Sequence, residues 1–242
     1  MFRLFKADIY RLLYKKNNIF IFVISEIICA LIAIIKTEQT GNISLLELCY
    51  GSFEWVLFPA IISIFALIYY VLYDYFENDF VSCEKVMGYT MTQIICSKAS
   101  AITVIFGMVF AGLPIVLIFV FESCYHRCIY DDLLIRSISL FLIIMRLCVD
   151  AIALNYIVHN FFIYMVSACT IWMIIPDFLK KNQVQNIRIY VFSWKYQMSL
   201  IASAGVTKGM LFKYVIPYEC IMFLIHLILM SGILYIWIKE NR

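Results

Sequence analysis

The sequence contains little charge for its length. Only 14% of its 242 residues are Asp, Glu, Lys or Arg, whereas 64% are apolar. A soluble domain carries about 25% charged and about 45–50% apolar residues. One water-soluble core would not account for this excess, and the mean hydropathy of +0.93 agrees. We therefore expect an all-α integral membrane protein.

Sequence signatures of soluble binding and catalysis are also absent. The net charge of +3 comes without a basic domain or stripe, which argues against nucleic acid as a partner. The nine cysteines form no CxxC pair, and Cys124, His126 and Cys128 offer too few ligands for a closed metal site. We expect no metal and no cofactor.

The chain also lacks the motifs of membrane-embedded enzymes. It has no GxSxG or HExxH, and only His226 of the three histidines falls clearly within a long apolar run. No phosphate-binding glycine loop occurs, so ATP, if it is used, must be bound by another chain. A membrane-embedded enzyme and a scaffold or sensor subunit remain as competing classes.

Six apolar runs are predicted to form membrane helices, which need about 17–25 residues, and the fifth run is short. They form a single transmembrane domain over residues 1–242, with spans at about 19–35, 55–73, 99–121, 137–157, 161–176 and 217–238. The third run contains small residues that permit close helix approach, namely Gly107, Ala111 and Gly112. A long outer loop is expected over about 177–216.

The segment before the first run predicts an amphipathic helix on the membrane surface. Its apolar residues recur at helical spacing at Phe2, Phe5, Ile9, Leu12 and Leu13. Its basic residues fall elsewhere, at Arg3, Lys6, Arg11 and Lys15. The alternative is an ordinary basic segment before a span.

The distribution of lysine and arginine gives the orientation. The N-terminal segment is basic, whereas the loop after the first span has only Lys36. The N-terminus is therefore expected in the cytoplasm, and six spans return the C-terminus to the same side. Residues 177–216 carry six basic residues and oppose this rule. The segment 77–100 and the short turn at His159 and Asn160 then face the cytoplasm.

The segment between the second and third runs reads ENDFVSCEKVMGYTMTQIICSKAS. Glu84 precedes Gly88, Thr90 follows it, and Lys98 stands just before the third run. This arrangement, with six spans and a surface helix, resembles the membrane subunits of type-2 ATP-binding cassette exporters. The departure is Met91, where the family often has arginine.

The resemblance implies that this connection is a cytoplasmic coupling helix docked on a separate ATPase subunit. The residues expected to serve coupling are Glu84, Lys85, Gly88, Tyr89, Thr90 and Lys98. Gly88 lets two helical pieces meet at an angle that another residue would resist. Lys98 is expected at the headgroup level with a hydrated ammonium. The alternative is a solvated loop without a partner.

Four ionisable residues lie near the middle of predicted spans: Glu26, Arg146, Asp150 and His226. Charge at this depth costs about 2.5–3.5 kcal/mol on insertion scales. Arg146 and Asp150 are four residues apart and can pair on one helix face. We expect an intramembrane polar cluster around Arg146, which either serves transport or only fixes helix packing. His226 is expected to be a neutral packing residue.

The resemblance makes an export permease the leading hypothesis. Such a subunit is not itself an enzyme, pairs with a second permease chain, the same or a sister, and binds two copies of an ATPase in a bacterial cell membrane. The substrate class it suggests is a peptide or amphiphile, as in lantibiotic and bacteriocin immunity. A drug or small-molecule efflux permease is the alternative.

Overall fold

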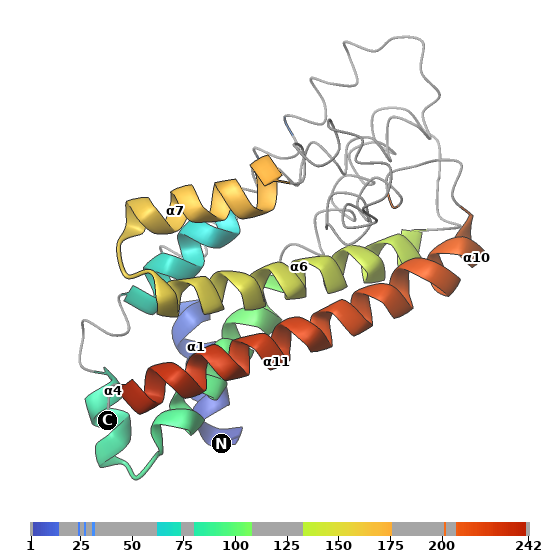
Figure 1. Ribbon diagram of the computed structural model, residues 1–242. Helices are drawn as coiled ribbons and strands as arrows, with labels where there is room; N and C mark the ends of the chain where they lie inside the picture. Colours follow the sequence, from blue (N-terminus) through green and yellow to red (C-terminus); the bar gives the residue numbers. More distant parts are fainter. Residues whose placement is uncertain are drawn as a thin grey trace.

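The computed structural model describes residues 2–14, 24, 27, 31, 62–73, 80–107, 133–175, 201 and 207–240. Within these residues the regular structure is helical, without strands, which confirms the all-α prediction for this part of the chain. The labelled elements are α1 (Phe2–Tyr14), α4 (Phe80–Val86), α6 (Leu133–Ile157), α7 (Phe161–Cys169), η1 (Thr170–Ile174), α10 (Lys208–Met210), η3 (Leu211–Val215) and α11 (Ile216–Glu240). The helices Ile62–Tyr73 and Met91–Gly107 lie between α1 and α6 in the chain (Figure 1).

Two helices in the described ranges are long and apolar enough to cross a membrane. They are Ile138–Ile157 within α6 and Leu211–Lys239, which runs from η3 into α11. The first matches the predicted span 137–157. The helices Ile62–Tyr73, Met91–Gly107 and Phe161–Trp172 are apolar but shorter. Of the predicted span 19–35, only residues 24, 27 and 31 are described, and each is helical.

The last helix begins earlier than the sequence suggested. The predicted span began at Pro217, but the helical backbone already starts at Lys208 in α10. A proline ring clashes with the carbonyl four residues before it in a regular α-helix. The π-helical segment η3 lies directly before Pro217 and widens the backbone there, so the helix continues through the proline. Residues 208–216 therefore belong to this helix and not to the outer loop.

The helix α6 forms the centre of the described structure. In the most apolar stretch of Ile138–Ile157, 72% of the residues are buried, whereas only 17% are buried in the corresponding stretch of Leu211–Lys239. Figure 1 shows α11 running alongside α6 in the same direction, while α7 folds back along it. The outer side of α11 exposes large apolar side chains such as Leu224, Ile228 and Tyr235. This side of α11 is thus a wide apolar surface that suits an apolar environment.

Gly107 permits close packing of the helix Met91–Gly107 on α6. A Cβ atom at this position would lie 2.7 Å from Cε2 of Phe141 and 3.0 Å from Sδ of Met145. Both distances are shorter than ordinary van der Waals contacts, so a larger residue would push the helices apart. The predicted role of Gly107 is confirmed, whereas Ala111 and Gly112 lie outside the described residues.

The N-terminal helix α1 is confirmed over Phe2–Tyr14, but its buried face differs from the predicted one. Leu4, Asp8 and Leu12 are buried, one residue per turn. Phe2 and Leu13, which were expected on the apolar face, are exposed. An acidic side chain therefore occupies the middle of the inward face.

Gly88 separates α4 from the helix Met91–Gly107. Its φ is +89°, a conformation that favours glycine. The amide of Gly88 donates to the carbonyl of Lys85, and that of Tyr89 donates to the carbonyl of Glu84. These two bonds form a Schellman motif that ends α4. The predicted meeting of two helical pieces at Gly88 is confirmed.

The next helix begins with a capping box. The Thr90 hydroxyl accepts a hydrogen bond from the Gln93 amide, and the Gln93 side chain accepts one from the Thr90 amide. The helix then continues without a break to Gly107. The short separate helix of the connection is therefore α4, before Gly88, and the residues after it open the longer helix.

Several helix ends meet at one end of the described structure, which we call the Gly88 end. The Tyr69 hydroxyl donates to the carbonyl of His159 in the α6–α7 turn. The rings of Tyr156 and Trp237 join the last turns of α6 and α11, with centroids 5.2 Å apart. Figure 1 shows α4, the start of α1 and the end of α11 at this same end.

Candidate functional site

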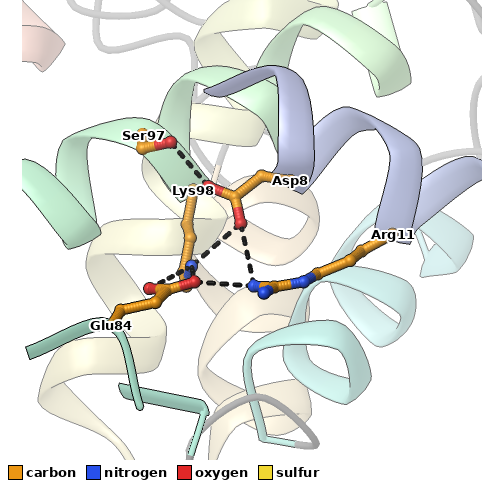
Figure 2. Close-up of polar contacts among 5 residues, drawn as sticks. All are labelled: Asp8, Arg11, Glu84, Ser97 and Lys98. Carbon is orange, nitrogen blue, oxygen red and sulfur yellow. Dashed lines mark hydrogen bonds and ion pairs between the residues drawn. The ribbon is translucent and has the colours of Figure 1, made fainter. Parts of the chain in front are cut away.

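A cluster of charged residues links α1 to the two helices around Gly88. We call it the Asp8–Lys98 cluster, and its members are Asp8, Arg11, Glu84, Ser97 and Lys98 (Figure 2). Asp8 and Arg11 come from α1, Glu84 from α4, and the other two from the helix Met91–Gly107. The side chains of Asp8, Glu84 and Lys98 are almost fully buried.

The cluster is held by short contacts between opposite charges. The Lys98 ammonium lies 3.0 Å from Oδ1 of Asp8 and 3.0 Å from Oε2 of Glu84. The Arg11 guanidinium approaches Oε1 of Glu84 to 2.6 Å, and the Ser97 hydroxyl donates to Oδ2 of Asp8 at 2.5 Å. Two carboxylates face two cations, so these ionised groups balance in charge.

The environment of Lys98 differs from the hydrated headgroup position expected for it. Its side chain is 5% exposed and is enclosed by the two carboxylates. Burial lowers the pKa of Lys98 because desolvation disfavours the ammonium, while Asp8 and Glu84 act in the opposite direction. The charged form of Lys98 therefore depends on both acidic partners.

The other residues predicted for coupling divide into inward and outward groups. Glu84 points into the cluster, and Tyr89 packs partly buried against Leu4 and Ile94. Thr90 caps a helix, and Gly88 forms the turn. Lys85 is exposed. Beside it, Val86 and Met87 have exposed fractions of 88% and 70%, although the sequence reasoning did not single them out.

A second set of polar residues joins α6, η1 and α11. We call it the Arg146–His226 network, and its members are Arg146, Asp150, Trp172, Glu219 and His226. Nη1 of Arg146 lies 3.1 Å and 3.3 Å from the two carboxylate oxygens of Glu219. The Trp172 indole donates to Oδ2 of Asp150 at 3.1 Å, and Nδ1 of His226 contacts Oδ1 of Asp150.

The network brings together three of the four predicted intramembrane residues, with different partners from those expected. Arg146 and Asp150 lie one turn apart on α6, but each pairs with α11 and not with the other. His226 is in contact with a carboxylate and is therefore not a lone packing residue. Glu26 lies outside the described residues.

Two acids in these clusters escaped the sequence reasoning. Asp8 stands four residues from Leu4 and from Leu12, so this spacing could have predicted that Asp8 lies on the inward face of the helix. Glu219 was left at the edge of the last predicted span because that span was begun at Pro217. Once the helix starts at Lys208, Glu219 lies inside the apolar stretch.

Comparisons of the chain with models of protein families, with curated proteins and with solved structures find no match. The resemblance to the exporter family therefore remains an expectation drawn from the residues around Gly88.

Proposed function

We propose that this chain is the membrane-spanning permease subunit of an ATP-binding cassette exporter, with six spans in a bacterial cell membrane. ATP would be bound and hydrolysed by a separate subunit, because the sequence offers no phosphate-binding loop. Two permease chains, identical or sister, would complete the transporter with two ATPase subunits. The exposed apolar side of α11 supports this proposal, since lipid or a second permease would cover it.

The main support for the proposal is that several turns and helix ends lie together at the Gly88 end. The α4–Gly88 turn, the N-terminal helix and the α6–α7 turn are the parts expected in the cytoplasm, and they lie together. This is the arrangement that a six-span chain with cytoplasmic termini would have. A separate ATPase would bind at this end.

The Asp8–Lys98 cluster supports a mechanical role for this turn. Its buried ion pairs fasten α4 to α1 and to the helix Met91–Gly107. A force applied to the turn would therefore reach both helices. Because Glu84 and Lys98 point inward, the residues that would contact the ATPase are Lys85, Val86 and Met87. Glu84 and Lys98, which were expected to serve coupling, would instead hold the turn in place.

Affinity purification of the chain from its native membranes tests the proposal. We expect an ATP-hydrolysing subunit to co-purify, and we expect Gly88→Leu to reduce its recovery or its coupling to transport. Gly209→Leu, at the opposite end, is the matched control and should keep the subunit. A chain that purifies from intact membranes without any ATPase would contradict the proposal and would suit an enzyme or scaffold instead.

The proposed substrate is a peptide or amphiphile expelled from the membrane or cell, such as a bacteriocin. Cells that express the complete transporter should tolerate the peptide better than cells in which the ATPase is inactivated. If the transporter protects cells only against small-molecule drugs, this result would favour the alternative function of drug efflux.

A further inference from the structure

The Arg146–His226 network contains an imbalance of charge. Arg146 and Glu219 form one ion pair and cancel each other. Among the residues that the structure describes, Asp150 is left with His226, whose imidazole is uncharged unless it takes up a proton. With a neutral imidazole and ionised carboxylates, the network would carry one net negative charge in the middle of an apolar helix pair.

The surroundings make that negative charge costly. The side chains of Asp150 and His226 are 10% and 23% exposed, and both belong to helices apolar enough to span a membrane. The Trp172 indole donates one hydrogen bond to Asp150, but it supplies no charge. A buried carboxylate without a cation is destabilised unless it is neutralised.

We propose that Asp150 and His226 together form a proton-binding site that holds one proton near neutral pH. Uptake breaks one O–H bond of a hydronium ion in solvent, which becomes water, and forms one N–H bond on the imidazole or one O–H bond on the carboxylate. Either form removes the excess charge of the network. The site does not depend on an ATPase partner.

The geometry favours a proton over a larger cation. Nδ1 of His226 and Oδ1 of Asp150 are in direct contact, which leaves no space for an ion between them. One carboxylate and one imidazole are also too few ligands for a metal ion. The nearby titratable side chains Cys148, Tyr164 and Tyr218 are ordinarily uncharged near neutral pH.

Loss of the proton would change the contact between α6 and α11. Arg146 lies one turn from Asp150 on α6, so two carboxylates, Asp150 and Glu219, would then compete for one guanidinium. Trp172 lies within the π-helical segment η1, and η3 ends four residues before Glu219. Such segments often occur at functional sites. Proton occupancy is thereby linked to the packing of the two helices.

Nuclear magnetic resonance of the full chain, labelled with ¹⁵N-histidine in lipid nanodiscs, tests the site. The chain has three histidines, so the His226 signals can be assigned by their loss in His226→Gln. In Asp150→Asn the ring loses its carboxylate partner. We expect the His226 ¹⁵N signals recorded at neutral pH to differ between Asp150→Asn and the unaltered chain. His159→Gln is the control and should leave the His226 signals unchanged.

A measurement on the unaltered chain keeps the test independent of variants that fail to fold. Infrared spectra together with the ¹⁵N signals report the state of both groups near neutral pH. A charged His226 ring, or a protonated Asp150 carboxyl lost in Asp150→Asn, agrees with the proposal. A neutral His226 beside an ionised Asp150 near neutral pH would overturn it.

Discussion

The ammonium of Lys98 lies 3.0 Å from Oδ1 of Asp8, although ninety positions separate the two residues in the sequence. This contact fastens the N-terminal helix to the helix that follows Gly88. Glu84 joins from α4 and contacts the same ammonium. Three segments that are separate in the chain are thus held together by buried charges.

Replacing Lys98 should destabilise the Gly88 end more than replacing a neighbouring exposed lysine. Lys98→Met leaves Asp8 and Glu84 buried with Arg11 as their only cation in the cluster. Breaking a buried pair in this way costs about 3–5 kcal/mol. We expect a clearly lower thermal unfolding midpoint in detergent, whereas Lys85→Met should change it little.

Restoring the charge balance should recover part of this loss. The double variant Lys98→Met with Glu84→Gln leaves one carboxylate, Asp8, and one cation, Arg11, which lie 3.6 Å apart. We expect it to unfold at a higher temperature than Lys98→Met alone. Equal midpoints for the single and double variants would show that charge balance does not stabilise the cluster.

Gly88 should tolerate asparagine better than alanine. No atom lies within 4 Å of the position that its Cβ would take, so the cost of substitution comes from the backbone at φ +89°. The left-handed conformation costs a non-glycine residue about 1–2 kcal/mol, and less for asparagine. The unaltered chain should have the highest unfolding midpoint, followed by Gly88→Asn and then by Gly88→Ala.

Gly209 in α10 provides the control for the alanine substitution. A Cβ atom at Gly209 also meets no atom within 4 Å, but this residue is helical and has no positive φ. Gly209→Ala should therefore be neutral, or stabilising by up to about 1 kcal/mol. If Gly88→Ala were equally harmless, the backbone explanation for Gly88 would be wrong.

The sequence allowed prediction of the helices and of Gly88 because these depend on local patterns. Apolar runs and a glycine between two helical segments can be read within a few residues. The partners of the charged residues could not be read in this way. Lys98 and Asp8 meet across ninety positions, and Arg146 pairs with Glu219 instead of its near neighbour Asp150. Such pairings are decided by how the helices pack.

The Arg146–Glu219 pair should show strong coupling in a double-mutant cycle. Arg146→Met strands Glu219, and Glu219→Gln leaves Arg146 without its carboxylate, so each single change should cost about 3–5 kcal/mol. The double variant removes both charges and should cost much less than the sum of the two. Unfolding midpoints of all four chains measure this coupling. Additive losses would mean that the pair does not stabilise the α6–α11 contact.

The close packing at Gly107 should be sensitive to a single added methyl group. In Gly107→Ala the new Cβ would meet the Phe141 ring at 2.7 Å, so the ring or the helix must move. Overpacking of this kind costs about 1–3 kcal/mol. Gly232→Ala is the matched control, since nothing lies within 4 Å of its Cβ position.

A compensating change in Phe141 tests the cause of that loss. Phe141→Leu shortens the side chain that the new methyl group meets, so Gly107→Ala should be less harmful in the Phe141→Leu background. Unfolding midpoints of the two single variants and the double variant provide the comparison. If Gly107→Ala costs the same in both backgrounds, contact with the Phe141 ring is not what requires glycine at this position.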